Sequence, residues 1–123
     1  MKKYLIPEDG NFYKSNLHCH SDISDGSLSC EEIKKIYKEK GYSIVAYTDH
    51  DVLLDHSDLN DESFLTLNGF EIEVNEEKEG PFYLKKSTHM CFIALDKDNL
   101  LQPCYHRTKY LFGNAPNYRD RIK

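Results

Sequence analysis

Two histidines separated by one residue, His18 and His20, are the first side chains whose types and spacing could do chemistry. Side chains of a β-strand alternate between its two faces, so both imidazoles would project from the same face. Asp25 follows on the adjoining loop. Two neutral imidazoles and a carboxylate make half of a mixed nitrogen and oxygen metal site. By itself, an HxH pair is more typical of a solvent-facing edge strand, so the assignment needs further ligands.

Further ligand types occur on three later segments that are predicted to be strands. His50 ends the second predicted strand, Glu71 lies in the third and His89 in the fourth. One ligand cluster per strand is typical of a site assembled at the rim of an α/β barrel. Divalent cations in such a site polarise a phosphoryl oxygen and lower the pKa of a bound water, so these residue types permit metal-assisted hydrolysis. Imidazole with carboxylate suits Mn²⁺, Zn²⁺ or Fe²⁺ better than Mg²⁺.

Two aspartates flank the histidine of the second cluster. Asp49 and Asp51 either orient ligand imidazoles from outside the ligand set or form the turn after the strand. The sequence favours neither role over the other.

The elements that position these residues begin with a strand over about residues 15–20. Ser29 can cap a following helix, Glu32 completes a Ser-x-x-Glu capping box, and Gly41 stands where the helix should end. Residues 43–48 are nearly continuous apolar sequence, which is typical of a parallel strand buried on both faces. Strand, helix and strand within about 35 residues predict a right-handed βαβ unit.

The chain after His50 is less regular. Residues 51–63 are acidic, which indicates a loop or short helix where a full crossover helix would be expected. Residues 64–74 are predicted to form a third strand, interrupted or bulged at Asn68-Gly69. A charged turn over residues 75–81 indicates a hairpin tip, residues 88–95 a fourth core strand, and residues 100–112 a weak helix broken by Pro103.

Composition excludes several classes of protein. The 123 residues are 39% hydrophobic and 30% charged, with a net charge of −5, which argues against a surface for duplex nucleic acid. No Gly-rich phosphate cradle is present, which argues against nucleoside triphosphate use. No apolar leader or stretch of about 20 apolar residues occurs, so we expect a cytoplasmic protein without a membrane partner. The four cysteines lack CxxC spacing and are predicted to be free thiols, with Cys19 a core residue.

The ordered motifs resemble the PHP (polymerase and histidinol phosphatase) domain family. The resemblance covers about residues 15–96 and is strongest to the small stand-alone phosphoesterases, which include nucleoside 3′,5′-bisphosphate phosphatases. It is carried by Leu17-His18-Cys19-His20-Ser21-Asp22-Ile23-Ser24-Asp25-Gly26, Thr48-Asp49-His50-Asp51, Gly69-Phe70-Glu71-Ile72 and His89.

This resemblance implies an α/β fold in which residues 1–123 form the N-terminal part of a distorted (β/α)7 barrel with a predominantly parallel sheet. It implies two or three divalent metal ions, Mn, Zn or Fe. His18 and His20 would bind one ion, Asp25 and His50 another, Glu71 would bridge, and His89 would serve a third position. Glu73 lies on the same strand face as Glu71 and is the alternative bridging carboxylate. No catalytic residue beyond the metal ligands is implied.

The implied function is a metal-dependent phosphoesterase, a hydrolase that acts on small phosphorylated substrates such as nucleotides or short oligonucleotides. The family places further ligands, a His or Cys and an Asp-x-His pair, in its second half, and we expect nothing in the sequence after His89 to supply them. We therefore expect the N-terminal portion of a barrel, with open surfaces that favour self-association. His56 and His106 are weaker ligand candidates. The alternatives are a metal-binding fragment without catalysis, and a PHP module with a structural or proofreading role in DNA replication.

Overall fold

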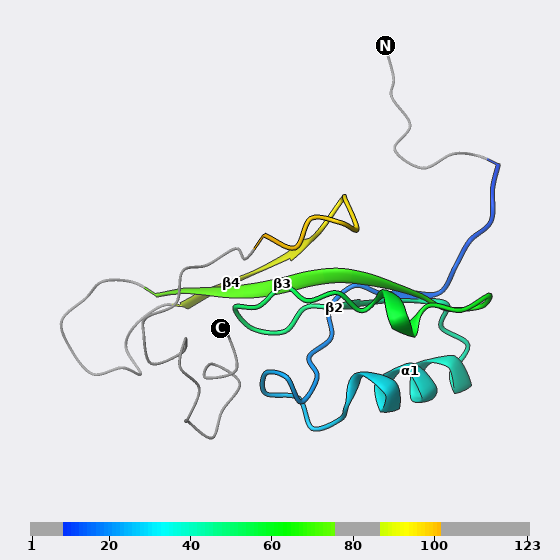
Figure 1. The fold of residues 1–123 in the computed structure, drawn as a ribbon, viewed down its shortest axis with the longest axis horizontal. Helices are drawn as coiled ribbons and strands as arrows, with labels where there is room; N and C mark the ends of the chain where they lie inside the picture. The colour runs from blue at the N-terminus through cyan, green and yellow to red at the C-terminus, as the bar shows by residue number, and fades with distance from the viewer. Residues whose placement is uncertain (1–8, 76–86, 102–123) are drawn as a thin grey trace, which may run out of the picture.

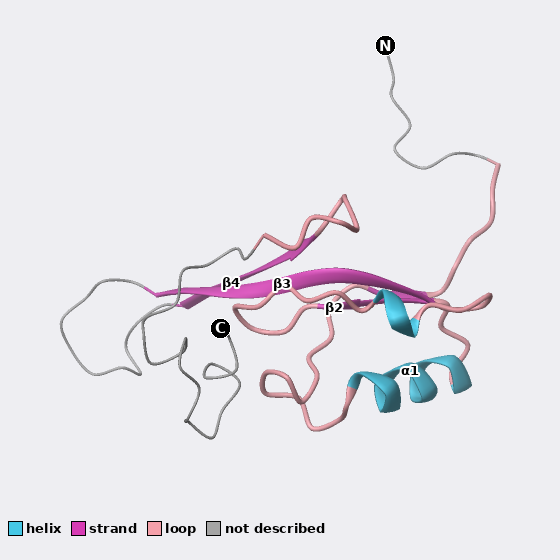
Figure 2. Ribbon diagram, viewed as in Figure 1, coloured by secondary structure: helices cyan, strands magenta, loops and turns pink. Residues whose placement is uncertain are grey.

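The structure is a computed structural model that describes residues 9–75 and 87–101 of the chain. Its four strands form one curled sheet in the order β1-β2-β3-β4, in which β1, β2 and β3 are parallel and β4 is antiparallel to β3. This confirms an α/β protein with a mostly parallel sheet, and closure into a (β/α)7 barrel stays a prediction. The elements are β1 (Ser15–Asn16), α1 (Cys30–Glu39), β2 (Ile44–Tyr47), a 3-10 helix η1 (Ser57–Leu59), β3 (Leu65–Asn75) and β4 (Ser87–Ile93) (Figures 1 and 2).

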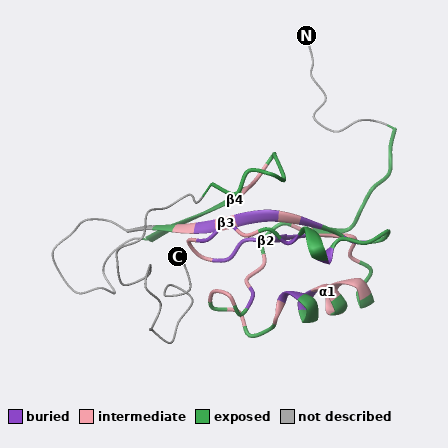
Figure 3. Cartoon of the chain, viewed as in Figure 1, coloured by how far each residue is buried: buried purple, intermediate pink, exposed green. Residues whose placement is uncertain are grey.

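Helix α1 lies against one side of the sheet and confirms the predicted capping signals. The Ser29 hydroxyl accepts from the Glu32 amide at 3.2 Å, and the Glu32 carboxylate accepts from the Ser29 amide at 2.9 Å. Gly41 follows the last turn with φ 75°, a conformation that glycine adopts without steric cost. The helix packs on the β2 side of the core, where the buried cluster comprises Cys30, Ile33, Val45, Tyr47, Leu59 and Phe64. Figure 3 shows that burial is concentrated along β2 and β3.

The βαβ unit is confirmed, but its first strand is shorter than predicted. The sheet ladder of β1 ends at Asn16, so the HxH segment lies beyond the strand. The Thr48 amide still donates to the Cys19 carbonyl at 2.8 Å, but the Cys19 amide donates to the Thr48 hydroxyl at 3.2 Å. The ladder therefore stops at Asn16, and the Cys19–Thr48 contacts keep the chain alongside the end of β2. Cys19 packs against the core, as predicted.

The connection from β2 to β3 confirms the prediction of a loop in place of a crossover helix. Residues 51–64 contain the 3-10 helix η1 and bury Val52, Leu53 and Leu59 beside the sheet. The same loop buries His56, whose ring lies 4.6 Å from that of Tyr47, centroid to centroid. This weaker ligand candidate is therefore a core residue, and His106 lies outside the described residues.

The predicted interruption of the third strand at Asn68-Gly69 is wrong. Strand β3 is continuous and changes partner at this point, because residues 65–68 pair with β2 and residues 69–75 pair with β4. A Cβ atom on Gly69 would come within 2.6 Å of the Phe92 carbonyl oxygen and 2.9 Å of the Thr48 methyl group. Close approach of β4 therefore explains the glycine that the sequence suggested as a bulge.

Strand β4 returns antiparallel beside β3, in agreement with the predicted hairpin, although most of the predicted turn lies outside the described residues. Its register places His89 opposite Glu73 and Cys91 opposite Glu71. The prediction of a core strand is wrong in one respect, because β4 is exposed along nearly its whole length (Figure 3). The predicted helix over residues 100–112 lies almost wholly outside the described residues.

Burial of His56 predicts a pH dependence of stability. Burial lowers the pKa of this imidazole below its usual value of about 6.5, against the opposing effect of the Asp49, Asp58 and Asp55 carboxylates. The unfolded chain then binds more protons than the folded chain between the folded and unfolded pKa values. The stability that the neutral ring provides is therefore complete above about pH 6.5 and is lost as the pH falls.

We expect acidification from about pH 7.5 to 5.5 to destabilise the wild type more than a His56→Phe variant, which keeps a buried ring. Urea unfolding followed by circular dichroism at several pH values measures this difference. Parallel pH profiles for the two proteins would contradict the assignment.

Candidate metal centre

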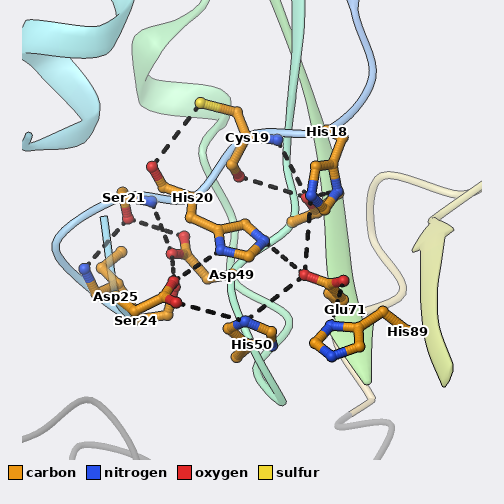
Figure 4. A network of polar contacts seen from close by, with 12 residues as sticks. His18, Cys19, His20, Ser21, Ser24, Asp25, Asp49, His50, Glu71 and His89 are labelled. Atoms are coloured by element: carbon orange, nitrogen blue, oxygen red, sulfur yellow. Dashed lines mark hydrogen bonds and ion pairs between the residues drawn. The ribbon is translucent and has the colours of Figure 1, made fainter. Parts of the chain in front are cut away.

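Segments that are distant in the sequence bring the six predicted ligands together (Figure 4). The extended segment after β1 supplies His18 and His20, and the loop that follows it supplies Asp25. His50 follows β2 and pairs with Glu71 of β3 in an isolated parallel bridge. His89 comes from β4, on the opposite edge of β3. The site therefore lies where β3 passes between the end of β2 and β4.

Glu71 lies at the point where the imidazoles converge. Its residue is 4% exposed. Its Oε2 atom lies 2.7 Å from His20 Nε2, 3.6 Å from His50 Nε2 and 3.8 Å from His18 Nε2. Its other oxygen, Oε1, accepts from His89 Nδ1 at 2.9 Å. One buried carboxylate thus faces four imidazoles.

The alternative carboxylate, Glu73, lies at the margin of this arrangement. It is exposed, and its Oε2 atom lies 3.5 Å from His89 Nε2. Of the two glutamates, Glu71 therefore has the central position.

Two buried atoms at the centre have no hydrogen-bond partner among the described residues. They are His20 Nε2 and Glu71 Oε2, and they face each other at 2.7 Å. Leaving buried polar atoms unpaired costs about 1–3 kcal/mol each, so such pairs are uncommon. A divalent cation that accepted both lone pairs would remove this cost, and the donor set fits one. The ligand atoms of His20, His50 and Glu71 all lie within 4.8 Å of one another.

Asp25 fixes which nitrogen of His20 faces Glu71. The Asp25 Oδ1 atom lies 2.7 Å from His20 Nδ1, and its Oδ2 atom lies 3.6 Å from His50 Nε2. A proton on Nδ1 donated to Asp25 leaves the Nε2 lone pair directed at the centre. Burial raises the pKa of Asp25, but the hydrogen bond from His20 and the attraction of the carboxylate to the protonated forms of His20 and His50 outweigh it and hold the pKa below its usual value.

The Glu71 carboxyl is held in its charged form by the same neighbours. Burial raises its pKa, but the hydrogen bond from His89 and the positive charges available on His50, His20 and His18 lower it further. The net shift is downward, so an ionised carboxylate lies among the imidazoles.

The contacts of Asp49 are with the loop that carries Asp25. Its buried carboxylate accepts from the Ser21 amide and from the Ser21 hydroxyl, both at 2.8 Å, and from the Ser24 hydroxyl at 2.5 Å. These contacts close the loop that carries Asp25 (Figure 4). Asp49 therefore acts on the site through the loop. Sequence reasoning missed both serines, whose signal was two hydroxyl residues in a short loop next to a buried aspartate.

Asp51 agrees with the turn-forming alternative. Its φ is 61°, in the left-handed region that aspartate tolerates better than most residues, and its amide donates to the Glu71 carbonyl at 2.8 Å. This bond ties the end of the β2 segment to β3 beside the centre.

Sequence reasoning also missed a cysteine in the site. Cys91 Sγ lies 2.7 Å from His18 Nδ1, and Thr48 Oγ1 lies 3.2 Å from the same nitrogen. Burial and the negative charge of Glu71 raise the pKa of the Cys91 thiol, although a hydrogen bond with Thr48 opposes them. The available signal was its spacing of two from His89, because both side chains leave the same face of β4.

The sequence of the chain was compared with models of known protein families. The family model of the PHP domain matches residues 16–121. The chain therefore belongs to the PHP domain family. A search of curated proteins found no match. Among the described residues, no helix has the length and apolar character needed to cross a membrane.

The loop held by Asp49 generates a prediction about positioning. We expect an Asp49→Asn variant to lose about 1–3 kcal/mol of stability, because an amide cannot accept all three hydrogen bonds as a carboxylate does. Displacement of Asp25 and His20 should also weaken binding of Mn²⁺ or Zn²⁺ by about 10–100-fold.

Titration calorimetry and thermal unfolding measure the two effects. Asp58→Asn, an exposed aspartate of η1, is the matched control and should change neither. Unchanged metal affinity in Asp49→Asn would contradict the positioning role.

Proposed function

We propose that the chain provides the metal centre of a metal-dependent phosphoesterase. The observation that carries the proposal is the pair of buried, unpartnered ligand atoms on His20 and Glu71, which face each other among further ligand types. Membership of the PHP family supports a hydrolase in general. We propose two or three divalent ions, Mn, Zn or Fe, held by His18, His20, Asp25, His50, Glu71 and His89.

When bound, such ions would polarise a phosphoryl oxygen, lower the pKa of a water molecule and stabilise a leaving oxygen. The residues of the chain prepare the site for this chemistry. The ionised Glu71 provides the negative charge that several cations can share, and Asp25 keeps the Nε2 lone pair of His20 directed at the centre.

Access to the site is uneven, and this supports a small phosphorylated substrate. The side chain of Glu71 is 6% exposed, whereas those of His18 and His89 are 51% and 45% exposed. Solvent therefore reaches the site at His18 and His89 and not at Glu71, and a phosphate group would approach from the side of these two histidines. Bound cations would offset the negative net charge of the chain locally, so nucleotides and short oligonucleotides remain suitable substrates.

The first test is metal content. We expect the purified chain to carry Mn, Fe or Zn, because the other five proposed ligands lie close to Glu71 or to its histidine neighbours. A His18→Ala/His20→Ala double variant should lose the metal and keep its secondary structure, as measured by elemental analysis and circular dichroism. The control is His56→Phe, because the structure places this histidine in the core and outside the proposed ligand set. Wild type without metal, and without a thermal shift on adding Mn²⁺ or Zn²⁺, would overturn the proposal.

The second test is phosphate release from 3′,5′-bisphosphonucleotides and 5′-phosphorylated oligonucleotides. We expect Glu71→Gln to reduce turnover by about a hundredfold or more, because loss of the shared charge misplaces the reacting groups. Glu73→Gln, the neighbouring carboxylate on the same strand, should reduce turnover far less. Activity that persists in excess chelator would contradict the mechanism. Metal binding without turnover would favour the alternative of a metal-binding protein without catalysis.

A further inference from the structure

The thiol of Cys91 belongs to a second group of potential ligands that the histidine and carboxylate motifs do not describe. The ligand atoms of His18, Glu71 and Cys91 all lie within 4.8 Å of one another. The cysteine is directly opposite Glu71 in the register of β3 and β4, and its Sγ atom contacts the imidazole of His18. Strand pairing, and not a flexible loop, therefore brings the sulfur to the site.

An independent observation shows that this group is directed at a shared centre. Glu71 Oε2 is buried, has no hydrogen-bond partner among the described residues, and belongs to a residue that is 4% exposed. The same carboxylate also completes the group of His20 and His50. Two groups of ligands, one with sulfur and one without, thus meet at one carboxylate.

The other described cysteines have different surroundings. Cys30 is buried in the hydrophobic core and Cys19 packs against that core. Neither belongs to a group of potential ligands in the part of the chain that the structure describes. Contact with the His18 imidazole and proximity to the Glu71 carboxylate therefore distinguish Cys91 from both.

We propose that Cys91 is a thiolate ligand, and that it makes the position of His18, Glu71 and Cys91 selective for zinc-like cations. Sulfur, nitrogen and oxygen donors together suit Zn²⁺ or Co²⁺, whereas Mn²⁺ and Mg²⁺ prefer sites without sulfur. Metal binding displaces the thiol proton to solvent, and the metal–sulfur bond replaces the sulfur–hydrogen bond. The position of His20, His50 and Glu71 lacks sulfur and accepts Mn²⁺ as well. This inference rests on the proposed function only in requiring that the cluster binds divalent metal.

Cobalt absorption spectroscopy of the full 123-residue chain tests the proposal without an activity measurement. Co²⁺ is added to metal-free protein in a phosphine reductant. Co²⁺ bound by any protein ligands gives visible d–d bands, and a thiolate ligand adds a charge-transfer band in the near ultraviolet. We expect the wild type to show both kinds of band. The Cys91→Ser variant should lose the charge-transfer band and keep the visible bands. Cys91 is exposed, so this substitution leaves no buried cavity.

Two controls identify the sulfur. Cys19→Ser and Cys104→Ser should both keep the charge-transfer band, because neither cysteine belongs to the proposed ligand set. In competition titrations, Cys91→Ser should weaken Zn²⁺ binding by about tenfold or more and leave Mn²⁺ binding unchanged.

The possible results separate this inference from the proposed function. Visible bands without a charge-transfer band in wild type would overturn the role of Cys91 and leave metal binding intact. A charge-transfer band that survives in Cys91→Ser, or is lost in a control variant, would also overturn it. Absence of both kinds of band would overturn metal binding itself, and with it the proposed function. Equal losses of Zn²⁺ and Mn²⁺ affinity in Cys91→Ser would contradict selectivity.

Discussion

A buried, ionised carboxylate is the constraint on which the rest of the site depends. Removing the charge of Glu71 from water is costly unless positive charge or hydrogen-bond donors surround it. The hydrogen bond from His89 supplies part of that compensation, and imidazoles from two other segments surround the second oxygen. Each segment is held by backbone pairing to β3 or its neighbour. The fold can therefore be understood as a sheet in which β3 carries one buried carboxylate and the flanking elements provide the imidazoles around it.

Local signals explain why much of the fold was predictable. The capping box at Ser29 and Glu32 depends on residues within one helical turn, and the apolar run of β2 reports burial on both faces. The identities of the site residues were predictable for a similar reason, because each group of potential ligands lies in or next to a strand that local sequence indicates. The distances between them depend on strand pairing across 20 or more residues, and sequence spacing does not specify these.

The predictions from the sequence differ from the structure where a side chain or strand contacts residues that are distant in the sequence. The Thr48 hydroxyl accepts from the Cys19 amide 29 residues earlier in the chain, and Asp49 binds a loop that lies 25 or more residues earlier. Gly69 resembled a bulge because the approach of β4 is invisible in the sequence around it. Cys91 was missed because its importance depends on lying opposite Glu71 once β3 and β4 have paired.

The pairing of Phe70 with Phe92 has a consequence for the opposite face of the hairpin. These rings stack with centroids 4.9 Å apart and planes 11° apart, and they sit directly opposite each other in the strand register. Side chains alternate between faces, so a slip of β4 by one residue would exchange Cys91 and His89 for Phe92 and Met90. The stacked Phe70 and Phe92 rings therefore favour the register of β3 and β4 in which the Cys91 thiol and the His89 imidazole lie on the same face as Glu71.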